Sequence, residues 1–179
     1  MEATSTTSST SSTNNLGLLY PGLQRNALWG YLFAVLLTVI FAYILGGFNN
    51  NFDTSNLQGI IPDGWSSLIW ILALVFLALG VYYATFCVDL VTAGVINSLL
   101  VLQLLFFIAW FIVFQRFGDF TSAFWAAIIL LVLALATLFF LWQAGAYQAS
   151  FFVIIYLIWL GYALWLTWQY LQQNGQRLF

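Results

Sequence analysis

The sequence predicts an all-α membrane protein in which five transmembrane helices form a bundle, and two observations support this fold class. Hydrophobic residues make up 64% of the 179 residues, charged residues make up only 4%, and the mean hydropathy is +1.00. A soluble domain keeps roughly a quarter of its residues charged. The chain also contains five apolar stretches of at least 22 residues. Because a helix rises about 1.5 Å per residue, even the shortest stretch is about 33 Å long and can cross the hydrocarbon core.

The apolar stretches also argue against the alternative folds. Five such helices joined by short loops leave no surface for water, unlike a soluble all-α protein. The stretches do not alternate apolar and polar residues, as the strands of a membrane β-barrel do over about ten residues. The five expected helices are residues 27–48, 65–86, 88–114, 122–143 and 149–171.

The segments outside these helices leave little room for a further domain. Residues 1–20 begin with a Ser/Thr/Asn tract that has one acidic residue and no basic one, so we expect a disordered tail and not a signal peptide. Residues 21–179 are expected to form one five-helix transmembrane domain. The longest internal loop, 49–64, follows the first helix and is the only loop long enough to act as a lid.

Between the second and third helices lie Cys87 and Asp89. We expect Asp89 to be a loop or cap residue at the membrane interface, the alternative being a role inside the membrane. No base lies near Cys87 to activate it, so an inert buried thiol is expected. Within the third helix, Gln103 and Trp110 lie two turns apart on one face.

The last helix carries a polar and aromatic face. Its members follow one another at steps of three or four residues, and they are Tyr156, Trp159, Ala163, Thr167, Tyr170 and Asn174. Trp159 lies near mid-membrane, where an indole N–H needs a partner or a ligand. Tyr162, Trp165 and Trp168 are expected to point elsewhere, the two tryptophans into the interfacial aromatic belt. Packing between helices without any ligand is the alternative interpretation of these faces.

The composition excludes several kinds of function. With no histidine and one cysteine, the chain lacks the ligands of structural zinc, iron–sulfur and His-ligated haem sites, so no metal and no cofactor are expected. It has no Ser/His/Asp set and no Gly-rich phosphate loop, so no catalytic residue is assigned. Three arginines without lysine form no basic patch for nucleic acid. Arg25 lies on one side of the five crossings and Arg116 and Arg177 on the other, which favours a cytoplasmic C-terminus.

Motifs in the last and third helices resemble those of one known family. Tyr156-Leu-Ile-Trp159-Leu-Gly-Tyr-Ala163, preceded by Ala149-Ser150 and followed by Asn174, is similar to the final helix of the translocator protein family (TspO/MBR, the tryptophan-rich sensory proteins). Gln103-Leu104, with Trp110 seven residues after the glutamine, is similar to the Gln-Leu-x-x-Asn-x-x-Trp pattern of its third helix.

The entry to the second helix resembles this family as well. Pro62-Asp-Gly-Trp65, with Trp70 downstream, is similar to the family's Pro-x-Trp entry and later Trp. Five helices and a long first loop extend the resemblance over nearly all of the chain past residue 20. The sequence departs from the family pattern at several positions. Ile155 replaces a Pro, Phe107 and Thr167 replace Asn residues, Leu74 replaces a Tyr, and Trp65 and Trp70 are five residues apart instead of six. The chain therefore resembles a divergent member.

The resemblance implies a flat hydrophobic ligand, such as a metal-free porphyrin, bound in a cavity beneath the 49–64 loop. It implies transport, sensing or degradation of a tetrapyrrole or lipid, with photo-oxidation of bound porphyrin as a secondary hypothesis. The family's sterol-associated pattern is not matched, because six residues separate Tyr170 from Arg177, so sterol recognition is less favoured. The ligand-binding residues implied are Trp65, Trp70, Gln103, Trp110, Tyr156, Trp159 and Ala163.

Roles follow for some of these residues. Trp65 and Trp159 would be walls, Ala163 the small position that lets a ring approach, and Gln103 a polar anchor. The alternative is a structural or assembly subunit whose aromatic stripes pack against a partner or against lipid. A transporter is less favoured, since no repeated half is evident. Gly94 and Ser98 form a small-xxx-small step that would suit a homodimer.

Overall fold

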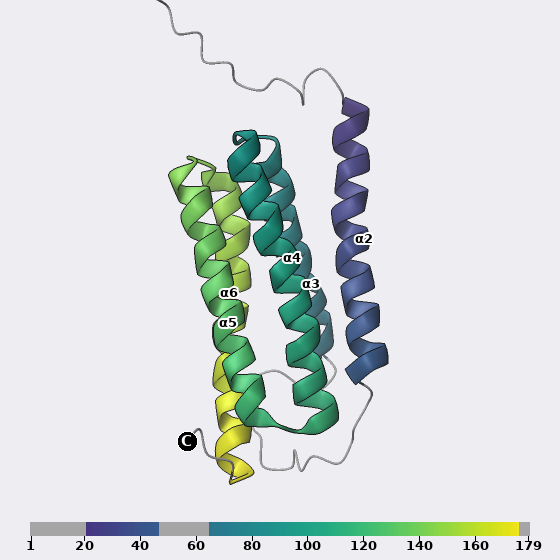
Figure 1. The fold of residues 1–179 in the computed structure, drawn as a ribbon, viewed down its shortest axis with the longest axis vertical. Coiled ribbons are helices and arrows are strands. Elements are labelled where there is room, and N and C mark those ends of the chain that lie inside the picture. The colour runs from purple at the N-terminus through teal and green to yellow at the C-terminus, as the bar shows by residue number, and fades with distance from the viewer. Residues whose placement is uncertain (1–20, 47–64, 176–179) are drawn as a thin grey trace, which may run out of the picture.

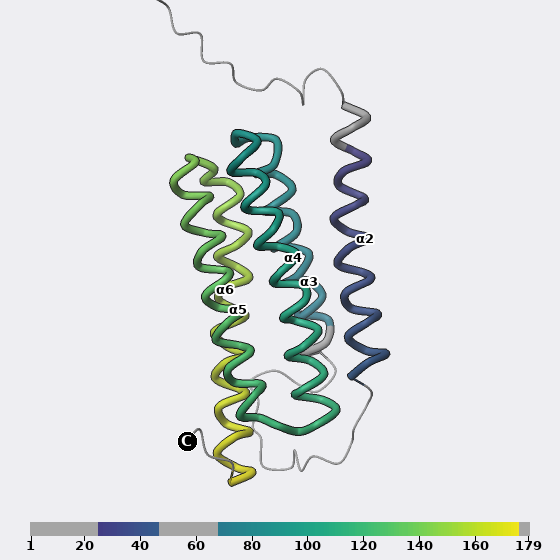
Figure 2. The backbone as a smooth tube through the Cα atoms, in the orientation of Figure 1, coloured from purple at the N-terminus to yellow at the C-terminus, as the bar shows by residue number. Residues whose placement is uncertain are grey.

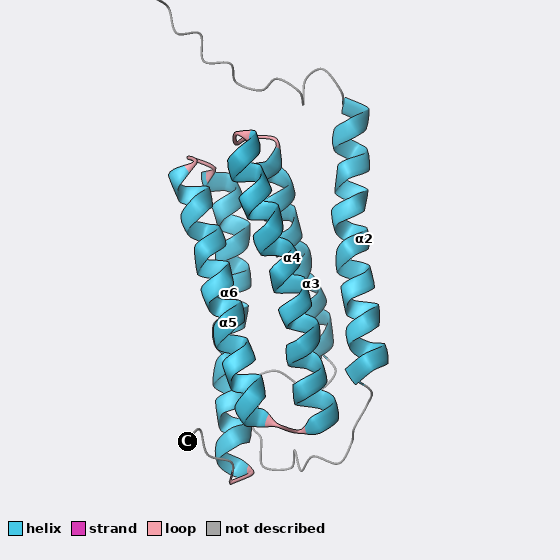
Figure 3. Ribbon diagram, viewed as in Figure 1, coloured by secondary structure: helices cyan, strands magenta, loops and turns pink. Residues whose placement is uncertain are grey.

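The computed structural model describes residues 21–46 and 65–175, with side chains described for 25–46 and 68–175. These ranges are helical throughout, apart from short turns, and contain no strand, which confirms the all-α prediction (Figures 1 and 3). The expected tail and the 49–64 loop lie outside the described residues. The elements are α2 (Pro21–Gly46), α3 (Trp65–Thr85), α4 (Leu90–Ile112), the π-helical turn η1 (Val113–Phe117), α5 (Phe120–Gln143) and α6 (Tyr147–Gln173).

Each of the five α-helices is long and apolar enough to cross a membrane, which confirms the five-helix prediction. Two boundaries differ from expectation in an informative way. The third helix begins at Leu90 instead of 88, because Asp89 is its N-cap. It changes at Val113 into η1, a π-helical turn that hydropathy does not reveal. Such turns are rare, and they are frequently found at functional sites.

The four helices α3 to α6 form a closed ring, and α2 lies outside it (Figures 1 and 2). Around the ring, α3 packs on α4, α4 on α5, α5 on α6, and α6 back on α3. The helix α2 packs against α3, α4 and η1. Its apolar span is 17% buried inside the protein, against 28–39% for the other four. Most of the described α2 surface is therefore exposed on the outside of the bundle.

Short turns set the antiparallel order of the ring. Asp89 accepts hydrogen bonds from the backbone N–H groups of Val91 (3.0 Å) and Thr92 (3.1 Å), so the expected role as a cap is confirmed. Hydrogen bonds from Thr92, first from its side chain, lower the pKa of Asp89 below its ordinary value.

Cys87 lies in the same turn and is exposed, so the expected buried thiol is wrong. Gly118, with φ of 62°, turns the chain from η1 into α5.

We call the half of the bundle with the turns at 86–89 and 144–146 the closed half. Here α3 and α6 approach closely at Gly80, where an added Cβ would lie 3.0 Å from the Ala149 carbonyl oxygen and 3.2 Å from the Phe152 Cβ. Small residues at such crossings let transmembrane helices pack by van der Waals contact. Even a methyl group at this crossing would require its neighbours to shift by a few tenths of an ångström.

A hydrogen-bonded cluster of Tyr31, Thr85 and Asn97 joins α2, α3 and α4 in the closed half. The Tyr31 hydroxyl donates to the Asn97 Oδ1, and the Asn97 amide donates to the Thr85 Oγ1 at 3.1 Å. The Thr85 hydroxyl donates to the Val81 carbonyl at 2.8 Å. In an apolar environment each unsatisfied polar group is costly, so these bonds hold α2 against the ring.

Candidate functional site

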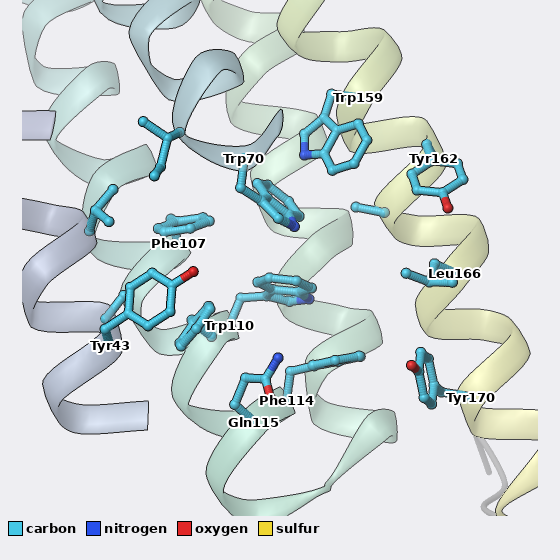
Figure 4. Close-up of a pocket in the computed structure, with 15 residues that line it drawn as sticks. Tyr43, Trp70, Phe107, Trp110, Phe114, Gln115, Trp159, Tyr162, Leu166 and Tyr170 are labelled. Atoms are coloured by element: carbon cyan, nitrogen blue, oxygen red, sulfur yellow. The ribbon is translucent and has the colours of Figure 1, made fainter. Parts of the chain in front are cut away.

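A cavity of about 160 Å³ lies in the opposite half of the bundle, which we call the cavity half (Figure 4). It lies between the end of α2, the start of α3, the end of α4 with η1, and α6. Its lining residues are Val39, Ala42, Tyr43, Trp70, Ile71, Phe107, Trp110, Phe111, Phe114, Gln115, Trp159, Tyr162, Ala163, Leu166 and Tyr170.

Aromatic rings form most of the cavity wall. The ring centroids of Trp70 and Trp110 are 4.8 Å apart, and Trp110 stacks on Phe114 at 5.1 Å with an angle of 22° between the planes. Trp159 meets Trp70 edge to face at 5.3 Å. Tyr162 extends this set along α6, 5.0 Å from Trp159. Ring faces and edges in this arrangement suit a flat apolar molecule.

Two of these rings carry a polar atom that has no hydrogen-bond partner among the described residues. The side chains of Trp110 and Trp159 are only 5% and 8% exposed. Within the described residues, neither indole Nε1 has a hydrogen-bond acceptor. An indole nitrogen can only donate. Buried donors are paired in the great majority of cases, so two unpaired ones on one cavity are unusual.

The rim of the cavity is fixed by a bond between η1 and α2. Arg116 donates from Nη1 to the carbonyl oxygen of Leu45 at 3.2 Å, next to the last residue of α2. A cation is favourable at a helix C-terminus, where carbonyl groups lack intrahelical partners. Gln115, the neighbour of Arg116, lines the cavity. The π-helical turn thus places one side chain on the cavity and the next on α2.

Four of the seven residues expected at the site lie together on this cavity, namely Trp70, Trp110, Trp159 and Ala163. They come from α3, α4 and α6, so the fold brings together positions that are far apart in the sequence. Trp65 begins α3, but its side chain lies outside the described ones. The 49–64 loop, expected to cover the cavity, also lies outside the described residues.

Gln103 and Tyr156 do not line the cavity. Gln103 is fully buried and donates from Nε2 to the Thr137 Oγ1 at 3.0 Å, so its amide nitrogen joins α4 to α5, while its Oε1 has no partner among the described residues. Tyr156 is also fully buried, one turn from Trp159. The structure therefore does not bring Gln103 to the cavity lining, because the face of α4 that carries it packs against α5 at this level, and its role as a polar anchor stays a prediction.

The sequence interpretation missed several lining residues. Tyr162 was expected to point away, yet it lines the cavity, because the cavity wraps around more of α6 than one narrow stripe. Trp165, in contrast, is 40% exposed, as an interfacial residue should be. On α4, the three-residue and four-residue steps from Phe107 to Trp110 to Phe114 would have indicated one wall. Tyr43 of α2 gave no signal, because that helix is apolar on every side.

The fold and the site define an integral multi-pass membrane protein with an internal aromatic cavity. Comparisons of the chain with protein-family models, with curated proteins and with solved structures found no match.

Proposed function

We propose that this protein binds a flat hydrophobic ligand in the aromatic cavity and is a divergent membrane binding protein of the translocator type. The observation that carries the proposal is the cavity walled by Trp70, Trp110 and Trp159. A planar apolar molecule binds such walls by stacking, without a metal or a charged partner. The residues implied by the resemblance also support it, since most of those with described side chains line one cavity.

The cavity volume bears on the size of the ligand. An apolar cavity of about 150 Å³ in another protein binds benzene, whereas pockets for drug-sized ligands measure roughly 300–1,000 Å³. At about 160 Å³, this cavity accommodates one or two fused rings without rearrangement. A porphyrin, the ligand that the resemblance implies, requires the walls to move apart. The proposed ligand is therefore a small planar molecule, with a tetrapyrrole as the larger candidate.

A second candidate function is that of a structural or assembly subunit. The observation in its favour is that Trp70 already contacts Trp110 and Trp159, with ring centroids 4.8 and 5.3 Å apart. Such contacts hold helices together without any ligand. This function predicts that the cavity binds nothing.

Two titrations of the purified protein in detergent separate the candidates. Naphthalene binding is measured by equilibrium dialysis against empty micelles, and protoporphyrin binding by quenching of tryptophan fluorescence. We expect naphthalene to bind and Trp159→Ala to weaken that binding about tenfold, because a ring wall is lost. Trp142→Ala is the matched control, since Trp142 is 61% exposed and outside the cavity.

The outcomes decide between the two functions. Absence of binding by both compounds would support the structural subunit. Equal losses in Trp159→Ala and Trp142→Ala would mean that the ligand binds elsewhere. Binding of protoporphyrin with the same dependence on Trp159 would show that the walls open.

A further inference from the structure

The unpaired indole donors restrict the chemistry of the ligand beyond its shape. Trp110 and Trp159 are each more than nine-tenths buried, both line the cavity, and neither Nε1 has a protein acceptor among the described residues. Figure 4 shows the Trp110 nitrogen on the side of its ring that faces α6, and the Trp159 nitrogen on the side that faces Trp70. The Trp110 donor therefore faces the space between α4 and α6, and the Trp159 donor faces Trp70 of α3, which its ring meets edge to face.

A ligand that fills this space with carbon alone would leave both donors unpaired. Leaving a buried donor unsatisfied is costly, while a hydrogen bond formed inside an apolar site is favourable. A ligand with an acceptor atom on its edge gains that bond. The donors thus favour an oxygen or nitrogen acceptor over a pure hydrocarbon.

The rest of the cavity wall argues against a charged ligand. No described lining residue carries a charge, and the polar side chains besides the indoles are Gln115 and tyrosines. A carboxylate or ammonium group in such a place would lose its hydration without gaining an ion pair. The acceptor is therefore a neutral group.

We infer that the ligand is a neutral, planar aryl carbonyl compound of one or two rings, whose carbonyl oxygen accepts a hydrogen bond from Trp110 or Trp159. This inference rests on the proposed function, since it assigns the ligand class of the same cavity. The aromatic side chains of the cavity wall contact the ligand, and an indole N–H group selects the carbonyl at its edge.

A matched pair of compounds tests the inference. 1-Indanone and indane share one fused-ring skeleton and differ in a single carbonyl group. Each is titrated against the detergent-solubilised protein by equilibrium dialysis, with a micelle-only correction for partitioning. We expect 1-indanone to bind about tenfold more tightly than indane, the effect of about one hydrogen bond.

Variants that remove only the donor locate the effect. Trp110→Phe and Trp159→Phe keep an aromatic ring and lose the N–H, so the two compounds should lose stacking area to the same extent. In at least one of the two variants, the ratio of the 1-indanone affinity to the indane affinity should fall toward one. Trp142→Phe, at an exposed tryptophan outside the cavity, keeps the preference.

Each outcome has a defined meaning. Equal binding of 1-indanone and indane would overturn the carbonyl assignment while leaving hydrophobic binding intact. A preference that survives in both Trp110→Phe and Trp159→Phe would overturn the role of the indole donors. Failure of both compounds to bind while naphthalene or protoporphyrin binds would overturn the ligand class, and failure of all four compounds would refute the proposed function itself.

Discussion

The two halves of the bundle treat polar groups in opposite ways. In the closed half, Tyr31, Thr85 and Asn97 pair with one another and with backbone carbonyls. In the cavity half, the indole nitrogens of Trp110 and Trp159 are buried and unpaired within the described part of the chain. The polar side chains named here are therefore hydrogen-bonded in the closed half, whereas the two indole donors of the cavity half have no acceptor among the described residues.

Packing differs in the same direction. At Gly80 the helices α3 and α6 are so close that a Cβ would press on backbone atoms. In the cavity half, large rings surround about 160 Å³ of empty space. This difference shows that the many aromatic residues have two structural roles. Some rings pack between helices, and others line the cavity.

The largest effect is expected from adding volume to the closed half. Gly80→Val places methyl groups against the Ala149 carbonyl and the Phe152 side chain, where neither can move cheaply. We expect a loss of about 3 kcal/mol in the free energy of unfolding, the upper part of the range for overpacked cores. The melting temperature in detergent measures it, with Gly94→Val as the control, since Gly94 has open space around its Cα. Equal melting temperatures for the two variants would show that the crossing is looser than described.

Adding volume to the cavity half should have the opposite sign. Ala163→Leu directs a larger side chain into the cavity that Ala163 lines. We expect unfolding stability to be unchanged or raised by up to about 2 kcal/mol, as for other cavity-filling changes. Naphthalene affinity should fall at least about tenfold, because the ligand loses its space. A destabilised protein with unaltered ligand binding would contradict the location of the site.

Two tyrosine hydroxyls give a matched comparison of smaller size. Tyr31→Phe removes the donor to Asn97 and should cost about 1 kcal/mol. Tyr156→Phe removes a buried hydroxyl that has no partner among the described residues, so stability should stay the same or rise. Chemical unfolding of both variants in the same detergent measures the difference. A loss in Tyr156→Phe as large as that in Tyr31→Phe would mean that this hydroxyl is paired in solution.

The smallest effect is expected at a helix cap. Asp119 accepts hydrogen bonds from the Ser122 hydroxyl and backbone N–H, which lower its pKa from the ordinary value of 3.8. Because the folded-state pKa is lowered, the stabilisation is complete above pH 3.8 and is lost as the pH falls below that value. Asp119→Ala should therefore lower stability by about 0.5 kcal/mol at neutral pH, with the difference from the native protein shrinking below pH 3.8. A difference that does not change with pH would rule out the charged cap as its cause.

The sequence predicts the helices well, because twenty apolar residues in a row have few other structures available to them. It also identifies Asp89 as a cap and places Trp159 and Ala163 on one face of the last helix by their four-residue step. These are local properties, which helical geometry converts directly into position.

The neighbours of each face could not be predicted in the same way. Gln103 shares a face with Trp110, yet it bonds to Thr137 of α5 while Trp110 lines the cavity. A polar face on a helix does not indicate which neighbouring helix packs against each of its turns. Tyr43 was missed because every side of α2 is apolar, so hydropathy cannot separate its lipid face from its cavity face. The exposure of Cys87 could not be predicted, because it depends on the exact position of the turn between α3 and α4.

Because α6 contributes to the cavity wall, the site can form only after α6 has been synthesised. Its walls come from α2, α3, α4 with η1, and α6, the first and the last of the described helices among them. Each ring helix packs on its successor, so those pairs can form as the chain emerges, whereas contact between α3 and α6 must await the synthesis of α6. A nascent chain that lacks α6 holds hairpins but no enclosed site. Ligand occupancy would thus distinguish a chain in which α6 is in place from a nascent chain that lacks it.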